Sequence, residues 1–374
     1  MSDGPGREAS GLRVDHISLV DFRSYPAAEL DLAPGFNAVL GPNGRGKTNL
    51  LEAIAYVSRL DSFRGVPAEA LVRSGAAAAV IRARIDHAGR EILVEAEIPT
   101  RGRPRVLANR QRVARRADLL SDYQVSVFTP DDLALVKDGP AIRRDFLDDL
   151  LISMHPRNDA VRTEFERVLR QRNALLKQVG GRLGPEAALT LDVWDERLAA
   201  CGQRLGELRV GAIERLAPVV TEAYRSLAGV DVEVSLSYES GWLDHGLAAA
   251  LSAGRRDDVR RGLSLVGPHR DDLWLGVGGM FARHRASQGE QRSLAFALRL
   301  AAHRVVTETI GCAPTLLLDD VFSELDPSRS AALLRSLPPG QTVLTSAIGL
   351  PAGAEPERVF EFVRDDAVPR RTDR

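Results

Sequence analysis

The chain has 374 residues, of which 44% are apolar, so it is long enough for one large or two ordinary domains with buried cores. Its 50 basic and 51 acidic residues give a net charge of -1, which excludes a generally basic nucleic-acid coat and confines any DNA-binding surface to a local patch. Two distant cysteines, Cys201 and Cys312, fit a reducing compartment better than a disulfide scaffold or a zinc site. With no apolar run of membrane length and no signal-like start, the sequence predicts a cytoplasmic protein.

Hydrophobic periodicity predicts the elements in chain order, after a flexible leader at residues 1–11. Alternating and short apolar runs predict strands at Leu12–Leu19, Ala28–Leu32, Phe36–Leu40, Val80–Ile85, Glu91–Ile98 and Arg105–Leu107, with a helix at Asn49–Leu60 after the third strand. The period then becomes helical over Ala141–Met154, Asp159–Val179 and Leu191–Leu227. Strands return at Asp231–Tyr238 and Leu273–Val277, followed by a helix at Gly289–Thr309 and buried strands at Thr315–Leu318 and Thr342–Ser346. Residues 364–374 are expected to form a flexible tail.

A glycine-rich octet between the third strand and the first helix fits the phosphate-loop pattern GxxxxGK[ST]. Its residues are Gly41, Pro42, Asn43, Gly44, Arg45, Gly46, Lys47 and Thr48. The glycines allow successive backbone N–H groups to surround a phosphate, Lys47 would reach the β- and γ-phosphates, and the Thr48 hydroxyl would bind Mg²⁺. A Gly-rich surface turn is the alternative, but the strand before the octet and the amphipathic helix after it favour nucleotide binding.

Two adjacent carboxylates, Asp319 and Asp320, follow the buried strand Thr315–Leu318. Such a pair is unfavourable without a cation nearby, so we expect Asp319 to bind Mg²⁺ and Asp320 to polarise the attacking water. A strand ending in a capped turn is the alternative.

A second phosphate-seeking segment begins at Ser287 and continues through Gln288, Gly289 and Glu290 into an apolar helix. Backbone N–H groups at a helix N-terminus, together with the serine hydroxyl, favour an anion. Simple helix capping by Ser287 uses the same geometry and remains an alternative.

Together, the phosphate loop, the serine–glycine helix start, the paired acids and the following Ser323–Asp326 segment resemble ATP-binding cassette (ABC) ATPases. Longer strings make the chain similar to the RecF proteins of bacterial recombinational repair, from about Leu12 to Ala347. These strings are GPNGRGKTNLLE (41–52), SFR (62–64), FTPDDL (128–133), RRDFLD (143–148), QRN (171–173), LLK (175–177), LDVWDE (191–196), VGPHRDDL (266–273) and SQGEQR (287–292).

The resemblance implies an α/β, ABC-type, SMC head-like ATPase lobe with an inserted, mainly helical second lobe. We expect a discontinuous head at 12–125 and 262–363 and a helical lobe at 126–261. In such heads two ATP molecules lie between two protomers, each bound by the phosphate loop of one chain and the Ser287 segment of the other, with Lys47, Ser287 and Asp320 in catalysis. The implied function is ATP-dependent DNA binding in recombinational repair, replication restart and the SOS response, with loading of mediators such as RecR. A weak, DNA-dependent ATPase activity would serve to open the dimer and release the DNA.

Several positions depart from the transporter ATPase pattern. Gln288 stands where those proteins have glycine, and Asp320 where they have glutamate, which suggests slow hydrolysis. No histidine follows the strand Thr342–Leu344, and whether Thr345 or Ser346 takes its place is open. Arg64 either faces the phosphates or is a surface arginine, and His269 is treated as a turn residue.

One stretch, Ile98–Ala117, has seven arginines and no acidic residue, and it is the candidate DNA-backbone contact. The arginines proposed to bind DNA are Arg101, Arg103, Arg105, Arg110 and Arg112. A solvated hairpin is the alternative. Other functions that share a phosphate loop are the ATPase subunit of a transporter, another SMC-like ATPase and a P-loop kinase.

Overall fold

The computed structural model describes residues 12–362 and 368–372, which form two compact units. Unit 1 comprises the described residues within Met1–Asp132, Ala223–Val230 and Phe296–Arg374, and unit 2 comprises Leu133–Glu222 and Asp231–Ala295. The sequence placed residues 262–295 in the head, whereas they belong to unit 2. The reason is strand pairing: β10 (Asp272–Val277) pairs with β9 (Val234–Glu239) and packs against α4 (Pro140–Met154). Among the described residues, no helix is long and apolar enough to cross a membrane.

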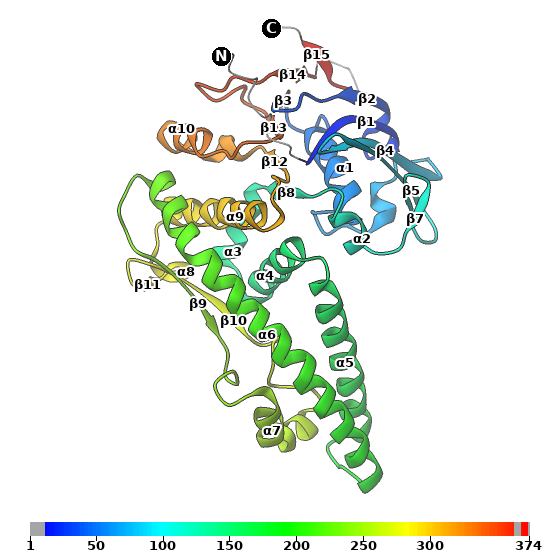
Figure 1. Cartoon of the computed structure of the whole chain (residues 1–374), viewed down its shortest axis with the longest axis vertical. Helices are drawn as coiled ribbons and strands as arrows, with labels where there is room; N and C mark the ends of the chain where they lie inside the picture. The colour runs from blue at the N-terminus through cyan, green and yellow to red at the C-terminus, as the bar shows by residue number, and fades with distance from the viewer. Residues whose placement is uncertain (1–11, 363–367, 373–374) are drawn as a thin grey trace, which may run out of the picture. The chain divides into compact units, whose positions relative to one another are not determined.

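Unit 1 contains two six-stranded sheets (Figure 1). The antiparallel sheet has the strand order β2 (Tyr25–Asp31), β1 (Leu12–Phe22), β4 (Ala78–His87), β5 (Arg90–Pro99), β6 (Arg105–Ala108) and β7 (Gln111–Val113). The second sheet has the order β15 (Arg370–Thr372), β14 (Arg358–Glu361), β3 (Phe36–Leu40), β13 (Thr342–Ser346), β12 (Thr315–Asp319) and β8 (Val125–Phe128). Its strands are parallel except for β15.

Helix α1 (Lys47–Arg59) contacts strands of both sheets, and its side chains join a single apolar core with them. Because a sheet lies on either side, α1 is buried on nearly its whole circumference, including Leu50, Ile54 and Val57. The remaining short helices of this unit are η1 (Ala68–Leu71), α2 (Ala117–Leu120), η3 (Val321–Glu324) and α10 (Pro327–Arg335), with η2 (Pro130–Leu133) at its boundary. The core therefore fixes the start of α1 at the carboxyl ends of the parallel strands.

Unit 2 combines helices with the antiparallel sheet β11–β10–β9, in which β11 spans Met280–Phe281. Its helices are α3 (Ala134–Lys137), α4, α5 (Asn158–Val179), residues 185–222 of α6 (Pro185–Ala228), α7 (Leu247–Arg261), α8 (Ala282–Arg285) and the first turns of α9 (Gln288–Ile310). Helices α5 and α6 run side by side, and the buried Arg172 of α5 donates a 2.6 Å hydrogen bond to Asp195 of α6 (Figure 1).

At the carboxyl end of the chain, residues 370–372 pair antiparallel with β14, where the sequence predicted only a flexible tail. The short strand extends the edge of the parallel sheet, because β14 would otherwise have unpaired backbone groups there. The predicted leader at 1–11, residue 363 at the end of the predicted head, and residues 364–367 and 373–374 of the predicted tail lie outside the described residues.

Candidate functional site

The phosphate loop joins β3 to α1 in a backbone conformation that requires glycine at two positions. Gly41 and Gly46 have φ values of 152° and 104°. A Cβ atom on Gly41 would lie 2.8 Å from Cβ of Phe362, and one on Gly46 would lie 2.5 Å from the Ser24 hydroxyl oxygen. Side chains therefore cannot replace these glycines without displacing neighbours, and the backbone remains accessible for an anion.

The Lys47 side chain lies against the same loop and is only 5% exposed. Its Nζ donates to the carbonyl oxygens of Gly41 (2.8 Å) and Pro42 (3.0 Å) and to Asn43 Oδ1 (3.4 Å). Burial lowers the pKa of this ammonium, and the carboxylates of Asp320 and Asp319 oppose that shift. Because these partners are neutral oxygens, a phosphate group would be a stronger partner for the charge.

Thr48, Asp319 and Thr345 meet at the carboxyl edge of the parallel sheet. Thr48 Oγ1 donates to Asp319 Oδ1 at 2.9 Å, and Thr345 Oγ1 donates to the same oxygen at 2.7 Å. Thr345 lies opposite Asp319 in the β12–β13 register, so parallel pairing brings residues distant in sequence to one point. Burial raises the pKa of Asp319, while the two hydroxyls lower it. Within the described residues this carboxylate forms no ion pair, which leaves it suited to a cation.

Asp320 has a left-handed backbone conformation, with φ of 50°. Its N–H donates to Thr345 Oγ1 (3.0 Å), and its Oδ1 accepts from the backbone N–H of Ala347 (3.2 Å). Thr345 thus contacts both acids, whereas the Ser346 hydroxyl accepts from the N–H of Ile348. Of the two candidates for the histidine position, Thr345 is the one that contacts the acid pair.

The Ser287 segment belongs to unit 2 and forms a capping box at the start of α9. The Ser287 N–H donates to Glu290 Oε2 at 2.7 Å, and the Glu290 N–H donates to Ser287 Oγ at 3.3 Å. Gln291 is buried and donates to the carbonyl oxygens of Ala282 and Arg283, which anchors the helix start. Gln288 is exposed and Gly289 is half-buried. In the chain alone, the hydroxyl of Ser287 therefore serves the capping role considered from the sequence.

The arginine-rich stretch follows the edge of the antiparallel sheet. Five of its arginines are exposed and form no ion pair within the described residues: Arg101, Arg103, Arg105, Arg110 and Arg112. Arg115 differs, because it pairs with Asp118. Arg110 and Asn109 form the two-residue turn that connects β6 to β7, and both have the positive φ values typical of such hairpin turns.

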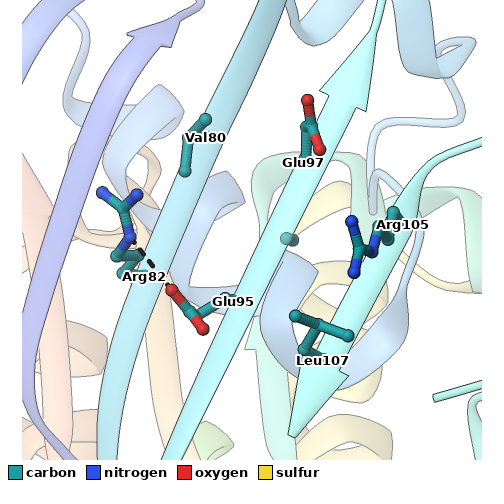
Figure 2. A pocket seen from close by; sticks show the side chains of 7 residues that line it. Val80, Arg82, Glu95, Glu97, Arg105 and Leu107 are labelled. Atoms are coloured by element: carbon teal, nitrogen blue, oxygen red, sulfur yellow. Dashed lines mark hydrogen bonds and ion pairs between the residues drawn. The ribbon is translucent and has the colours of Figure 1, made fainter. Parts of the chain in front are cut away.

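A shallow pocket on the exposed face of β4, β5 and β6 distinguishes Arg105 from the other arginines (Figure 2). Arg105 lies opposite Glu97 in the β5–β6 register, and both line the pocket. On the same face, Arg82 donates to Glu95 at 3.1 Å. Carboxylates therefore reduce the positive potential around Arg105 more than around Arg101 and Arg103.

Comparison with known proteins gives consistent matches along the chain. A model of the RecF/RecN/SMC N-terminal domain matches residues 13–343. The DNA replication and repair protein RecF of Frankia alni is 44% identical over 354 residues, covering 90% of this chain and 93% of that protein. RecF of Kineococcus radiotolerans is 41% identical over 387 residues, covering 96% and 97%. The chain belongs to the RecF family. The family predicted from the sequence motifs is thereby confirmed.

Solved structures support the same conclusion for the fold. The recombination mediator protein RecF–ATP of the RecFOR pathway is 26% identical, with a TM-score of 0.89, and the match covers 99% of this chain and 100% of that one. The Smc head domain of Pyrococcus furiosus, with an extended coiled coil and bound to the C-terminal domain of ScpA, is 17% identical with a TM-score of 0.57, and the match covers 96% of each chain. The ABC-type, SMC head-like α/β fold with a helical insertion, predicted from the sequence, is confirmed.

Sequence reasoning missed one contact of the phosphate loop. Tyr25 is completely buried, and its hydroxyl donates to the carbonyl oxygen of Gly46 at 2.9 Å. Its ring lies 6.5 Å from that of Phe362, which packs under Gly41. The segment Arg23–Pro26 has the composition of a turn, which concealed a buried tyrosine that supports the loop.

Proposed function

We propose that this member of the RecF family binds ATP with Mg²⁺ at the phosphate loop and uses the nucleotide to control DNA binding in recombinational repair. The arrangement of Thr48, Asp319 and Thr345 beside Lys47 carries this proposal. It provides a buried ammonium and a buried carboxylate, neither of which has a charged partner within ion-pair distance among the described residues. The similarity to RecF–ATP supports ATP as the ligand.

Mg²⁺ fits the oxygen atoms that meet at this edge of the sheet. The hydroxyl of Thr48 and the carboxylate of Asp319 are hard oxygen ligands of the kind this ion prefers. Burial raises the pKa of Asp319 although Thr345 and Thr48 donate to it, and a bound cation would oppose that shift. When bound, Mg²⁺ would neutralise charge on the phosphates. Asp320, held by the Ala347 N–H, would orient water for weak, DNA-dependent hydrolysis to ADP and phosphate.

A second copy of the chain is the proposed partner for the Ser287–Glu290 segment. Its capping box leaves the helix N-terminus of α9 exposed at Ser287, and such an end favours a phosphate. In the ATP-bound homodimer, the segment of one protomer would contact the nucleotide on the phosphate loop of the other. Opening of the dimer after slow hydrolysis would release DNA.

DNA binding is assigned to the exposed arginine-rich edge, mainly Arg101, Arg103, Arg110 and Arg112, with Arg105 contributing less. Two such edges in a dimer would bind DNA more tightly than one. Roles in replication restart, the SOS response and the loading of mediators such as RecR follow from family membership, and we propose them for this chain on that ground.

Light scattering tests the proposal directly. The wild-type chain should be monomeric without nucleotide and dimeric with ATP and DNA, and Ser287→Arg should stay monomeric because the added side chain blocks the phosphate. Ser252→Arg, which adds the same charge to exposed α7 of the same unit, is the matched control and should dimerise. Normal ATP-dependent dimerisation of Ser287→Arg would exclude the sandwich arrangement.

A further inference from the structure

Glu52 is an unusual carboxylate, because it is completely buried on α1, one turn beyond the phosphate loop. Arg23 donates to it twice, from Nε to Oε2 at 2.8 Å and from a terminal nitrogen to Oε1 at 3.0 Å. The hydroxyl of Ser62 donates a further short hydrogen bond to Oε1. A buried ion pair of this kind is a weak source of stability, since desolvation offsets most of the attraction, so its presence calls for another explanation.

The hydrogen bonds of Glu52 connect three segments around the site. Arg23 lies in the β1–β2 turn, and its side chain also donates to the carbonyl oxygen of Ala70 at 2.9 Å. The next two residues of that turn contact the phosphate-loop region, since Ser24 accepts from Asn49 and Tyr25 donates to Gly46. Glu52 therefore fixes α1 and this turn relative to the loop that begins at residue 61.

Ser62 also fixes the backbone of Arg64. Its hydroxyl oxygen accepts from the backbone N–H of Arg64 at 3.1 Å, and its carbonyl oxygen accepts from the N–H of Gly65. Ser62 is only 6% exposed, so the loop is held from its buried side while the Arg64 side chain stays exposed. Within the described residues the Arg64 guanidinium forms no ion pair, and the hydrogen bond from Ser62 to Glu52 brings its loop back to the first turns of α1, next to the phosphate loop.

We propose that Glu52 and Ser62 are positioning residues, which hold the 61–65 loop so that the Arg64 guanidinium faces the phosphates of a bound nucleotide. The inference rests on the proposed ATP site. An exposed arginine loses conformational freedom when it contacts a phosphate, and a fixed backbone reduces that loss. The buried ion pair of Glu52 thus serves the geometry of the site rather than the stability of the fold.

Amide exchange and a double-mutant cycle test this role, with Ser62→Ala as the main variant because it keeps the Glu52–Arg23 pair. Without nucleotide, the Arg64 amide should exchange faster in Ser62→Ala than in the wild type. ATP turnover should fall about tenfold, as for a loss of about 1.4 kcal/mol of transition-state stabilisation, with a smaller change in ATP affinity. Ser62→Thr, which keeps the hydroxyl, should restore both, and Glu52→Gln should act in the same direction as Ser62→Ala.

In the Arg64→Ala background, Ser62→Ala should lower turnover by no more than about twofold, because the residue that it positions is gone. The matched control is Asp132→Asn, which removes another buried carboxylate of unit 1 that pairs with an arginine, and its effect should add to that of Arg64→Ala. Unchanged exchange at Arg64, or a full effect of Ser62→Ala without Arg64, would overturn this inference alone. A wild-type chain that binds no ATP would overturn the proposed function and this inference together.

Discussion

Buried charged side chains have ion-pair partners in unit 2 but lack them at the carboxyl edge of the parallel sheet, within the described residues. In unit 2, three arginines are at most 3% exposed, and each pairs with aspartate: Arg143 with Asp272, Arg172 with Asp195 and Asp258, and Arg209 with Asp148. In unit 1, Lys47 and Asp319 are 5% and 7% exposed, and neither forms an ion pair within the described residues. Paired charges complete a structure by themselves, whereas unpaired ones need a ligand to offset their desolvation. The difference separates the self-contained ion pairs of unit 2 from the charges at the sheet edge that a ligand would compensate.

The largest effect is expected where a paired charge is removed. Arg172→Met leaves Asp258, which is 1% exposed, without its cation, and should lower the free energy of unfolding of unit 2 by about 3–5 kcal/mol. Urea unfolding followed by tryptophan fluorescence measures this, because Trp194, Trp242 and Trp274 all lie in unit 2.

Arg167→Met is the control on the same helix, because its exposed pair with Glu164 should contribute less than about 1 kcal/mol. Equal unfolding midpoints for the two variants would show that the buried ion pair of Arg172 does not stabilise unit 2 more than an exposed pair does.

Removing an unpaired cation should affect the ligand and leave the fold intact. Lys47→Met should weaken ATP binding about 100-fold, since charge-assisted hydrogen bonds to phosphate contribute about 1.5–3 kcal/mol each. Titration with a fluorescent ATP analogue measures the affinity, and the calorimetric unfolding of the variant should match that of the wild type. Lys177→Met, at an exposed lysine of α5, is the control that should bind normally. Retained affinity in Lys47→Met would place the nucleotide elsewhere.

Removing the unpaired anion should stabilise the chain. Burial raises the pKa of Asp319, so its ionised form opposes folding at neutral pH. Asp319→Asn keeps an oxygen that can accept from Thr48 and Thr345, and should raise stability by about 0.5–2 kcal/mol at pH 7.5. The gain should disappear as the pH falls through the raised pKa toward the ordinary value of about 3.9.

Calorimetry at several pH values measures the gain, and the variant should also lose the Mg²⁺-dependent part of ATP binding. The same change at Asp132, which is 6% exposed and paired with Arg299, should instead lower stability. If both variants shifted stability in the same direction, pairing would not explain the difference between the two carboxylates.

The smallest effect concerns the exposed arginines. Arg101→Gln and Arg103→Gln, made as separate variants, should each reduce the slope of log K for DNA binding against log salt concentration by about 0.9 per lost phosphate contact. Arg105→Gln should reduce it less than either, because Glu97 lies opposite. Arg82→Gln, at an arginine already bound to Glu95, is the control and should leave the slope unchanged. Equal slopes for all four variants would exclude this edge as the DNA contact.

Local patterns were sufficient for the elements that form the site. The apolar runs before Gly41 and Asp319 are the strands β3 and β12, and the helical period after Thr48 is α1. Each signal is contained within a few consecutive residues, so no knowledge of distant partners was needed.

The remaining features depend on pairing between distant segments. Strand β8, only Val125–Phe128, joins the parallel sheet through β12, and β14 joins it through β3, but neither has a distinctive local pattern. The contact of Thr345 with the acid pair follows from its register opposite Asp319, which the sequence left open against Ser346. The boundary of the helical unit was misplaced for the same reason, since β9–β10 pairing cannot be read from either strand alone.

The position of β3 in the sheet has a consequence for synthesis of the chain. It is the first strand of the parallel sheet to be made, yet its neighbours, β13 and β14, are among the last. Gly41 donates to the carbonyl oxygen of Ser346 and packs over Phe362, so the loop lacks its support until both have left the ribosome. A product truncated before Thr342 would contain Lys47, Thr48 and Asp319 but no assembled site.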